Sequence, residues 1–457
     1  MRAIDQRFSA HADDISREQD RLFYAIYALG VIYDRSHDGS NSSQNKELAF
    51  KLHCEALRLR VVRNRTFSIV SAQAEFLTCL YYLTMSMFAE AWMAVGSLAR
   101  SLQAIGLHRF TKVDSPTHFD CEDGKRLFWC AYCLDRYLSA MLGRPNAFQD
   151  RDIDADFPTL VSDVEENEVY GLGSAGPCLM TAALAHFKLA KIVGCITTDI
   201  YGPSCRDISQ RQQLIVALRN RVNDWAEQLP AYLSPHSGGR LPLLPTYARQ
   251  ASVLNLAYWH AILSLYRSYV VLRSPDPSLD ATFVSVAQDE ALEAAQSIAT
   301  AVRQIHDSGH YTFGFWFTSY IAFSASLVMI VSTSQLHPNE SRYASLDSSI
   351  RSCMLFLESV GRINRVTDLY FKVVQNIRNA VRENAPQVNN AIPDSAVDFD
   401  WSWFDETFAM NQAQSSSGNA RQHVMQDHET SYLGQYNPGF FQSPADMLEA
   451  YVISTTT

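Results

Sequence analysis

The sequence predicts an all-α protein: a large multi-helix domain of antiparallel helix hairpins followed by a disordered carboxyl-terminal tail. Apolar residues recur at the three- to four-residue spacing of one helix face along most of the chain up to residue 382. No segment of any length alternates apolar and polar residues as a half-buried strand does. Beyond residue 383 the composition turns to Asn, Gln, Ser and Pro, which bury too little apolar surface to offset the entropy of ordering.

These observations divide the chain into three parts: a polar amino-terminal segment at 1–21, the helical domain at 22–382 and the tail at 383–457. Gly106 and Gly143 are expected to end two of the helices, because glycine adopts the left-handed conformation that closes a helix. The periodicity places helices at 22–33, 46–64, 68–89, 91–105, 124–142, 177–200, 209–229, 246–271, 283–306, 311–333 and 346–382.

The overall charge argues against direct binding of nucleic acid. The chain has 457 residues and a formal net charge of −10, whereas proteins that grip phosphates usually have a basic domain. Its nine cysteines are odd in number and irregularly spaced, and residues 2–21 carry no apolar export signal. We therefore expect an intracellular protein with reduced cysteines.

One segment, 311–335, has no charged residue and is long enough to span a bilayer. Serines, threonines and a glycine are spread along it, and no Lys or Arg clusters flank it. A helix buried at the centre of a helical domain has the same composition. We therefore predict a core helix and no membrane association.

No catalytic or metal-binding fingerprint is present. The Cys130-x-x-Cys133 pair lies in an apolar helical run with no second pair nearby at zinc-site spacing, which favours buried structural thiols. A calcium loop starting at Asp152 would need Gly and Glu where the chain has Phe157 and Asp163. We predict no cofactor, no metal and no enzymatic activity, with a helical enzyme as a remote alternative.

The tail contains one distinctive segment, 394–408, in which acidic residues alternate with large aromatic residues. The acidic residues keep the rings solvated and available to a partner. The segment is a candidate activation segment that folds on contact with a coactivator groove, and the alternative is a tail without function. Its aromatic residues are Phe399, Trp401, Trp403, Phe404 and Phe408.

Two sequence blocks carry a family resemblance. Residues 91–109 end in Gly-Leu-His-Arg. Residues 125–145 begin with Lys-Arg-Leu-Phe-Trp, continue through Asp-Arg and end in Gly-Arg-Pro, and an acidic loop that closes on a proline follows them. Together they resemble the fungal-specific transcription factor domain, or middle homology region, of binuclear zinc-cluster transcription factors. The matching positions are Gly106, Leu107, His108, Arg126, Phe128, Trp129, Asp135, Arg136, Gly143, Arg144, Pro145 and Pro158.

The resemblance implies a nuclear regulator of RNA polymerase II transcription, controlling metabolic genes. Its implied partners are the transcription machinery or coactivators, and other zinc-cluster factors or a second copy of the chain. The family carries a six-cysteine zinc cluster that reads DNA, and no such cluster is present before residue 22. We therefore expect contact with DNA only through a missing module or a partner, and zinc only in such a missing module. The alternative is a DNA-free module that pairs with zinc-cluster factors and modulates them.

Four charged residues of the second block, Arg126, Asp135, Arg136 and Arg144, are predicted to form a network that fixes a helix hairpin. The alternative role for them is direct contact with a ligand.

Overall fold

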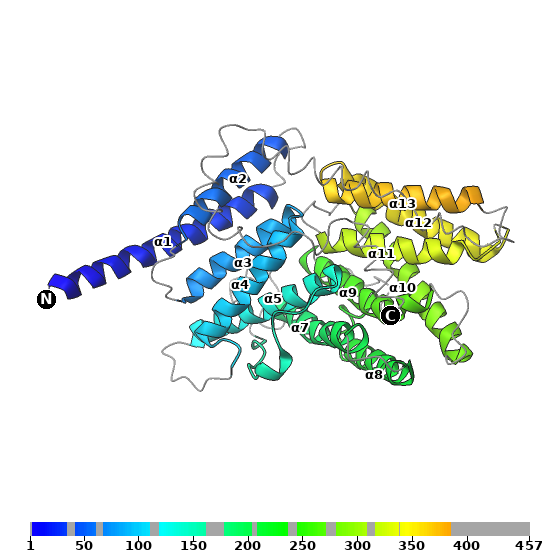
Figure 1. The fold of residues 1–457 in the computed structure, drawn as a ribbon, viewed down its shortest axis with the longest axis horizontal. Helices are drawn as coiled ribbons and strands as arrows, with labels where there is room; N and C mark the ends of the chain where they lie inside the picture. The colour runs from blue at the N-terminus through cyan, green and yellow to red at the C-terminus, as the bar shows by residue number, and fades with distance from the viewer. Residues whose placement is uncertain are drawn as a thin grey trace.

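A computed structural model describes residues 2–33, 42–60, 67–109, 118–160, 178–202, 208–235, 245–270, 280–308, 316–337 and 339–384. All long elements in these ranges are helices and none is a strand, so the all-α prediction is confirmed. Figure 1 shows α1 to α4 on the left and α11 to α13 at the upper right, with α5 and α9 in the centre and α7 and α8 below. The predicted tail lies outside the described residues, apart from its first two positions.

The amino-terminal part consists of α1 (Arg2–Tyr33), α2 (Ser42–Arg58), α3 (Ile69–Thr84) and α4 (Phe88–Ile105). Helix α1 also includes the polar segment 2–21, where the apolar periodicity predicted no helix. That segment contains neither proline nor glycine, so nothing in it interrupts helical hydrogen bonding. α1 packs against α2 and α3 around a small separate core that includes Ala28, Ile32 and Tyr81.

Helices α3 and α4 are separated by a tight turn at Met85–Met87, where Ser86 has a positive φ of 58°. The next helix, α5 (His118–Leu142), packs against α4 and, through its other side, against α7. Both predicted glycine ends are present, with φ of 91° at Gly106 and 61° at Gly143.

The middle of the molecule contains α7 (Leu179–Cys195), α8 (Ile208–Glu227) and α9 (Pro245–Val270). Helix α7 ends in a π-helical turn, η4 (Ile196–Ile200), which packs against α8 and α9. One continuous apolar core runs from α3 through these helices to α13.

The carboxyl-terminal part contains α10 (Ala281–Asp307), α11 (Trp316–Thr333), α12 (Ser341–Gly361) and α13 (Arg365–Asn384). The sequence predicted one helix at 346–382, but the chain turns between α12 and α13. The Asn364 side chain accepts a hydrogen bond from the backbone N–H of Thr367 (3.0 Å), as a helix-capping residue does. A Cβ atom on Gly361 would lie 2.9 Å from the Cα of Asp368, so this glycine permits the close approach.

Two of the described helices are long and apolar enough to cross a membrane by length and composition: Leu179–Ile200 and α11. About 72% of α11 is buried within the molecule, and half of the other. Helix α11 packs against α9, α10, α12 and α13. In this structure α11 is therefore the core helix that the sequence predicted.

Candidate regulatory site

After Gly143 the chain reverses and runs back along α5 as a segment without regular structure, apart from a short 3₁₀ turn, η2 (Asp150–Asp152). We call residues 144–160 the strap. Most of the predicted family positions lie in α5, in the strap or at the end of α4, so these three segments form the candidate site.

Arg136 of α5 lies at the centre of the site with only 2% of its surface exposed. Its Nη1 and Nη2 atoms both donate to the carbonyl oxygen of Phe148, each at 3.1 Å, and Nη2 also donates to Asp150 Oδ1 at 2.8 Å. Its guanidinium carbon lies 4.3 Å from the centre of the Tyr132 ring. Burial opposes the charge, but Tyr132, Asp135 and Asp150 together raise the pKa of Arg136. The buried cation is thus held by the strap and by its own helix.

Asp135, the preceding residue, binds the backbone of the same part of the strap and is 1% exposed. Its Oδ1 atom accepts from the N–H of Ala147 at 2.9 Å, and its Oδ2 atom from that of Phe148 at 3.2 Å. Oδ2 also accepts from Arg136 Nη1 at 3.1 Å. Burial raises the pKa of Asp135, and the Arg136 charge and the two N–H groups partly counteract that rise.

The second half of the strap is held by Trp129 and Glu122 of α5. The indole Nε1 of Trp129 donates to the carbonyl of Asp156 at 2.9 Å, and its ring lies 4.3 Å from that of Phe157. Glu122 Oε2 accepts from the N–H of Thr159 at 2.8 Å. Pro158, between these contacts, is buried. The strap is therefore bound to α5 along most of its length.

The end of α4 contacts the strap from its other side. The carbonyl of His108 accepts from the N–H groups of Asp154 and Ala155, both at 3.2 Å, and Arg109 pairs with the Asp154 carboxylate at 3.1 Å. Leu107 packs against Gly124 of α5 so closely that a Cβ there would lie 2.9 Å from Leu107 Cδ2. The Gly-Leu-His motif thus holds the strap through the backbone carbonyl of His108.

Two of the four residues of the predicted charge network, Asp135 and Arg136, form an ion pair. The Arg144 guanidinium lies 4.9 Å from the Trp92 ring of α4, and Arg126 is half-buried on α5. Burial lowers the pKa of Arg144. Ser139 donates to the carbonyl of Pro145 at 3.3 Å, which fixes the turn into the strap.

Three partners of the site were missed by the sequence analysis: Tyr132, Asp150 and Gly194 of α7. Tyr132 donates to Asp150 Oδ1 at 2.7 Å, and a Cβ on Gly194 would lie 2.8 Å from Arg136 Cδ. No local pattern marks these residues, because their contacts form only when the strap folds back along α5 and α7 packs against α5. Asp150 lies in the acidic loop that the sequence places before Pro158.

A second buried polar cluster lies where α5, α7, α9 and α11 meet. The Tyr137 ring is 5.0 Å from that of His186 and 4.8 Å from that of Phe317, which in turn is 5.0 Å from that of His260. Tyr137 Oη, His186 Nε2 and His260 Nδ1 have no hydrogen-bond partner in the described part of the chain. Burial lowers the pKa of His186 to about 4 and that of His260 to about 3, so both rings are neutral at neutral pH.

Among the described residues, no group of three or more His, Cys, Asp or Glu side chains is placed to hold a metal ion. Cys130 and Cys133 are free thiols on α5, and Cys133 lies 3.8 Å from the carbonyl oxygen of His186. Burial raises the pKa of Cys130 to about 11, which disfavours a thiolate.

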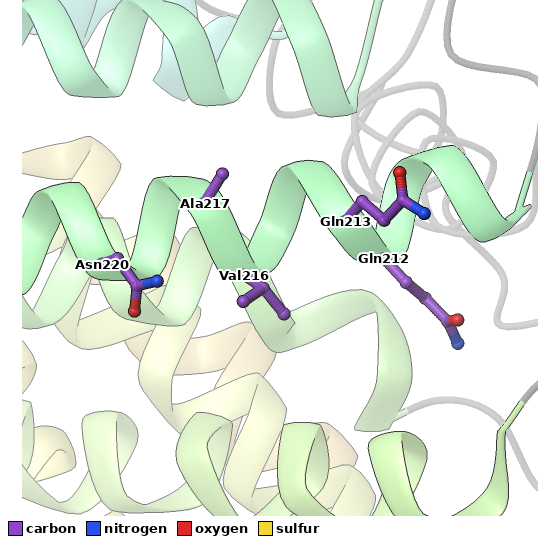
Figure 2. A pocket seen from close by; sticks show the side chains of 5 residues that line it. All are labelled: Gln212, Gln213, Val216, Ala217 and Asn220. Carbon is purple, nitrogen blue, oxygen red and sulfur yellow. The ribbon is translucent and has the colours of Figure 1, made fainter.

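The outer face of α8 borders a shallow surface hollow of about 410 Å³, shown in Figure 2. Its described lining is uncharged and comes from this helix alone: Gln212, Gln213, Val216, Ala217 and Asn220. The hollow contains none of the predicted site residues. The five aromatic residues of the candidate activation segment lie outside the described residues.

Residues 10–227 match the fungal specific transcription factor domain. The chain is 23% identical over 356 residues to "Activator of stress genes 1" of Saccharomyces cerevisiae, covering 75% of this chain and 36% of that protein. It is 30% identical over 268 residues to an uncharacterised transcriptional regulatory protein of Schizosaccharomyces pombe, covering 56% of this chain and 34% of that protein. It is 25% identical over 289 residues to "Transcriptional activator protein acu-15" of Neurospora crassa, covering 62% of this chain and 30% of that protein.

The chain thus spans about a third of the length of these relatives. No solved structure matches it.

Proposed function

Since residues 10–227 of this chain match the fungal specific transcription factor domain, we propose that the protein is a fungal transcriptional regulator that works in the nucleus and has no enzymatic activity. The observation that carries the proposal is this match, together with relatives that are named as transcriptional regulators or activators. The net charge of −10 supports a role in which this part of the protein contacts other proteins rather than DNA phosphates.

Within this proposal the family residues have a structural role. Arg136 and Asp135 are almost fully buried and their polar atoms bind the strap backbone, which leaves them little capacity to contact a ligand. Trp129 and His108 hold the other half of the strap in the same way. The motif keeps α4, α5 and the strap in one fixed arrangement on which a regulatory surface is built.

We further propose that the segment 394–408 is the part that contacts a coactivator or the transcription machinery. Its five acidic residues and five large aromatic residues suit binding of an amphipathic segment to an apolar groove with basic surroundings.

A reporter assay tests both parts of the proposal. The full chain, fused to a heterologous DNA-binding domain, is expected to change transcription of a reporter gene in a fungal host. Replacing Phe399, Trp401, Trp403, Phe404 and Phe408 by Ala is expected to reduce activation at least tenfold at equal protein abundance. The double variant Phe440→Ala/Phe441→Ala, which changes aromatic residues elsewhere in the tail, serves as the matched control.

The regulatory function and the activation segment can each be contradicted separately by this assay. A full chain that leaves the reporter unchanged in either direction would contradict the regulatory function. A five-residue variant as active as the wild type would contradict only the assignment of the activation segment.

A further inference from the structure

Three hydrogen-bonding groups are left unpaired where α5, α7, α9 and α11 meet. Tyr137 Oη, His186 Nε2 and His260 Nδ1 are shielded from solvent and have no hydrogen-bond partner in the part of the chain that the structure describes. Buried polar atoms in native proteins are almost always paired with protein, with water or with a bound molecule. An unpaired buried group is destabilising, so three of them in one cluster indicate a partner from outside the chain.

Tyr137 and His186 are neighbours that leave each other unpaired. Their ring centres lie 5.0 Å apart, yet the hydroxyl group and the imidazole Nε2 atom do not bond to each other. Tyr137 is 4% exposed, whereas His186 is half-buried. The pair therefore has one end in the core and one end open to solvent, through which a small molecule can enter.

The surroundings of this pair are aromatic. The Phe317 ring of α11 lies 4.8 Å from the Tyr137 ring and 5.0 Å from the His260 ring. The Tyr320 ring, 6.0 Å from that of Phe317, continues this wall. A mainly apolar lining with a few polar atoms is typical of sites for small organic molecules. A water molecule needs two to four polar partners, and the Phe317 ring offers it none.

The unpaired atoms determine which functional group suits the site. Burial keeps the His186 ring neutral, so its Nε2 atom is a donor in one tautomer and an acceptor in the other. The Tyr137 hydroxyl group also donates and accepts. A hydroxyl group on the ligand complements both, because it has the same two capacities. An ion would lose its hydration here and meet only the neutral groups of this pair.

We propose that this junction is a binding site for a small uncharged organic molecule that carries a hydroxyl group on an aromatic or other apolar body. The hydroxyl group bonds to Tyr137 and His186, and the body packs against Phe317. His260 Nδ1 supplies a further polar atom at the deep end of the site, where the side chain is 1% exposed.

The site extends beyond the family match. Helices α5 and α7 lie within residues 10–227, whereas α9 and α11 lie outside them. The proposal does not rest on the proposed function, and its failure would leave the outcome of the reporter assay unaffected.

Binding of phenol and of toluene to the purified full chain, measured by isothermal titration calorimetry, tests the proposal. The two probes have nearly the same shape, and only phenol carries a hydroxyl group. Phenol is expected to bind at least about tenfold more tightly, which is the effect of one hydrogen bond to a buried group. A purely apolar void would show the opposite order, because toluene leaves water more readily.

The variant Tyr137→Phe removes the hydroxyl group of the site and keeps the ring. It is expected to weaken phenol binding about tenfold and to leave toluene binding unchanged. Without a probe it should resist urea at least as well as the wild type, because no hydrogen bond is lost. The matched control is Tyr132→Phe on the same helix, which removes the bond to Asp150 (2.7 Å). This control should be less stable than the wild type and should keep the preference for phenol.

Failure of phenol to bind, or tighter binding of toluene than of phenol, would overturn the proposal. A loss of stability in Tyr137→Phe without a probe would also overturn it, because the hydroxyl group would then already be paired with water. Unchanged phenol binding in Tyr137→Phe would show that the ligand hydroxyl group does not lie at Tyr137 and His186, and would contradict the proposed site.

Discussion

Buried polar residues in this protein fall into two kinds that respond differently to substitution. Arg136 keeps its charge because Asp135, Asp150 and the Phe148 carbonyl surround it. His260 is equally buried but has no carboxylate among its observed ring contacts, so it stays neutral. Arg136 therefore fixes the strap, whereas His260 makes the free energy of unfolding depend on pH.

Replacing Arg136 by Met is expected to destabilise the fold by about 3–5 kcal/mol, since the Asp135 carboxylate loses its buried counter-charge. Denaturation by urea of the full chain measures this. The control is Arg342→Met, which removes the exposed ion pair with Asp289 (2.7 Å) and should cost less than about 1 kcal/mol. Similar losses in the two variants would contradict the assigned role of Arg136.

His260 predicts a loss of stability in mild acid. In the folded chain burial lowers the pKa of His260 to about 3, whereas in the unfolded chain the ring takes up a proton near the ordinary pKa of 6.5. Its contribution is therefore complete above pH 6.5 and is lost as the pH falls from 6.5 toward 3. Between pH 6 and 5 the wild type should lose up to about 1.4 kcal/mol more than His260→Gln. Parallel curves of unfolding free energy against pH would refute this.

At the scale of elements, turns decide how the helices pack. The turn after α3 and the turn after α12 lie far apart in sequence but touch each other: Asn364 Nδ2 donates to Ser86 Oγ at 2.9 Å. Lys46 of α2 also donates to the carbonyl of Ile363 at 2.8 Å. These bonds connect the first helices of the chain with the last pair.

Asn364→Ala is expected to cost about 2–3 kcal/mol, because it removes both the cap of α13 and the buried bond to Ser86. The matched variant is Asp280→Ala, which removes the exposed cap bond of α10 to the Thr282 N–H (2.9 Å) and should cost about 1 kcal/mol. Thermal and urea unfolding compare the two. Equal costs would indicate that the contact with Ser86 adds no stability.

At the scale of the whole molecule, one core from α3 to α13 implies cooperative protection of its interior. Cys79, Cys133 and Cys353 are buried in that core, and burial raises the pKa of each thiol. Cys54 and Cys178 are more exposed.

Alkylation of the native chain near pH 8, read by mass spectrometry at each site, should therefore modify Cys54 and Cys178 before the three buried thiols. The three buried thiols should react at least about 100-fold more slowly until the chain unfolds. Equal rates at Cys353 and Cys178 would show that the core opens locally instead.

The sequence by itself determined the helical class, the helix ends at Gly106 and Gly143, and the family motif. These features depend on local periodicity, on the conformational freedom of glycine and on short spacings, all of which are visible in a linear chain. It failed at the break between α12 and α13. Gly361 and Asn364 are residue types that favour helix ends, but the apolar periodicity continues past them, and the contacts with Asp368 and Ser86 that fix the turn form only in the folded chain.

Only the tertiary structure decided which polar residues are paired. Arg136 meets Asp150, and His260 meets Phe317, through contacts between different segments of the chain. It also decided which face of α1 is covered, since both faces of residues 22–33 are apolar and only packing against α2 and α3 distinguishes them.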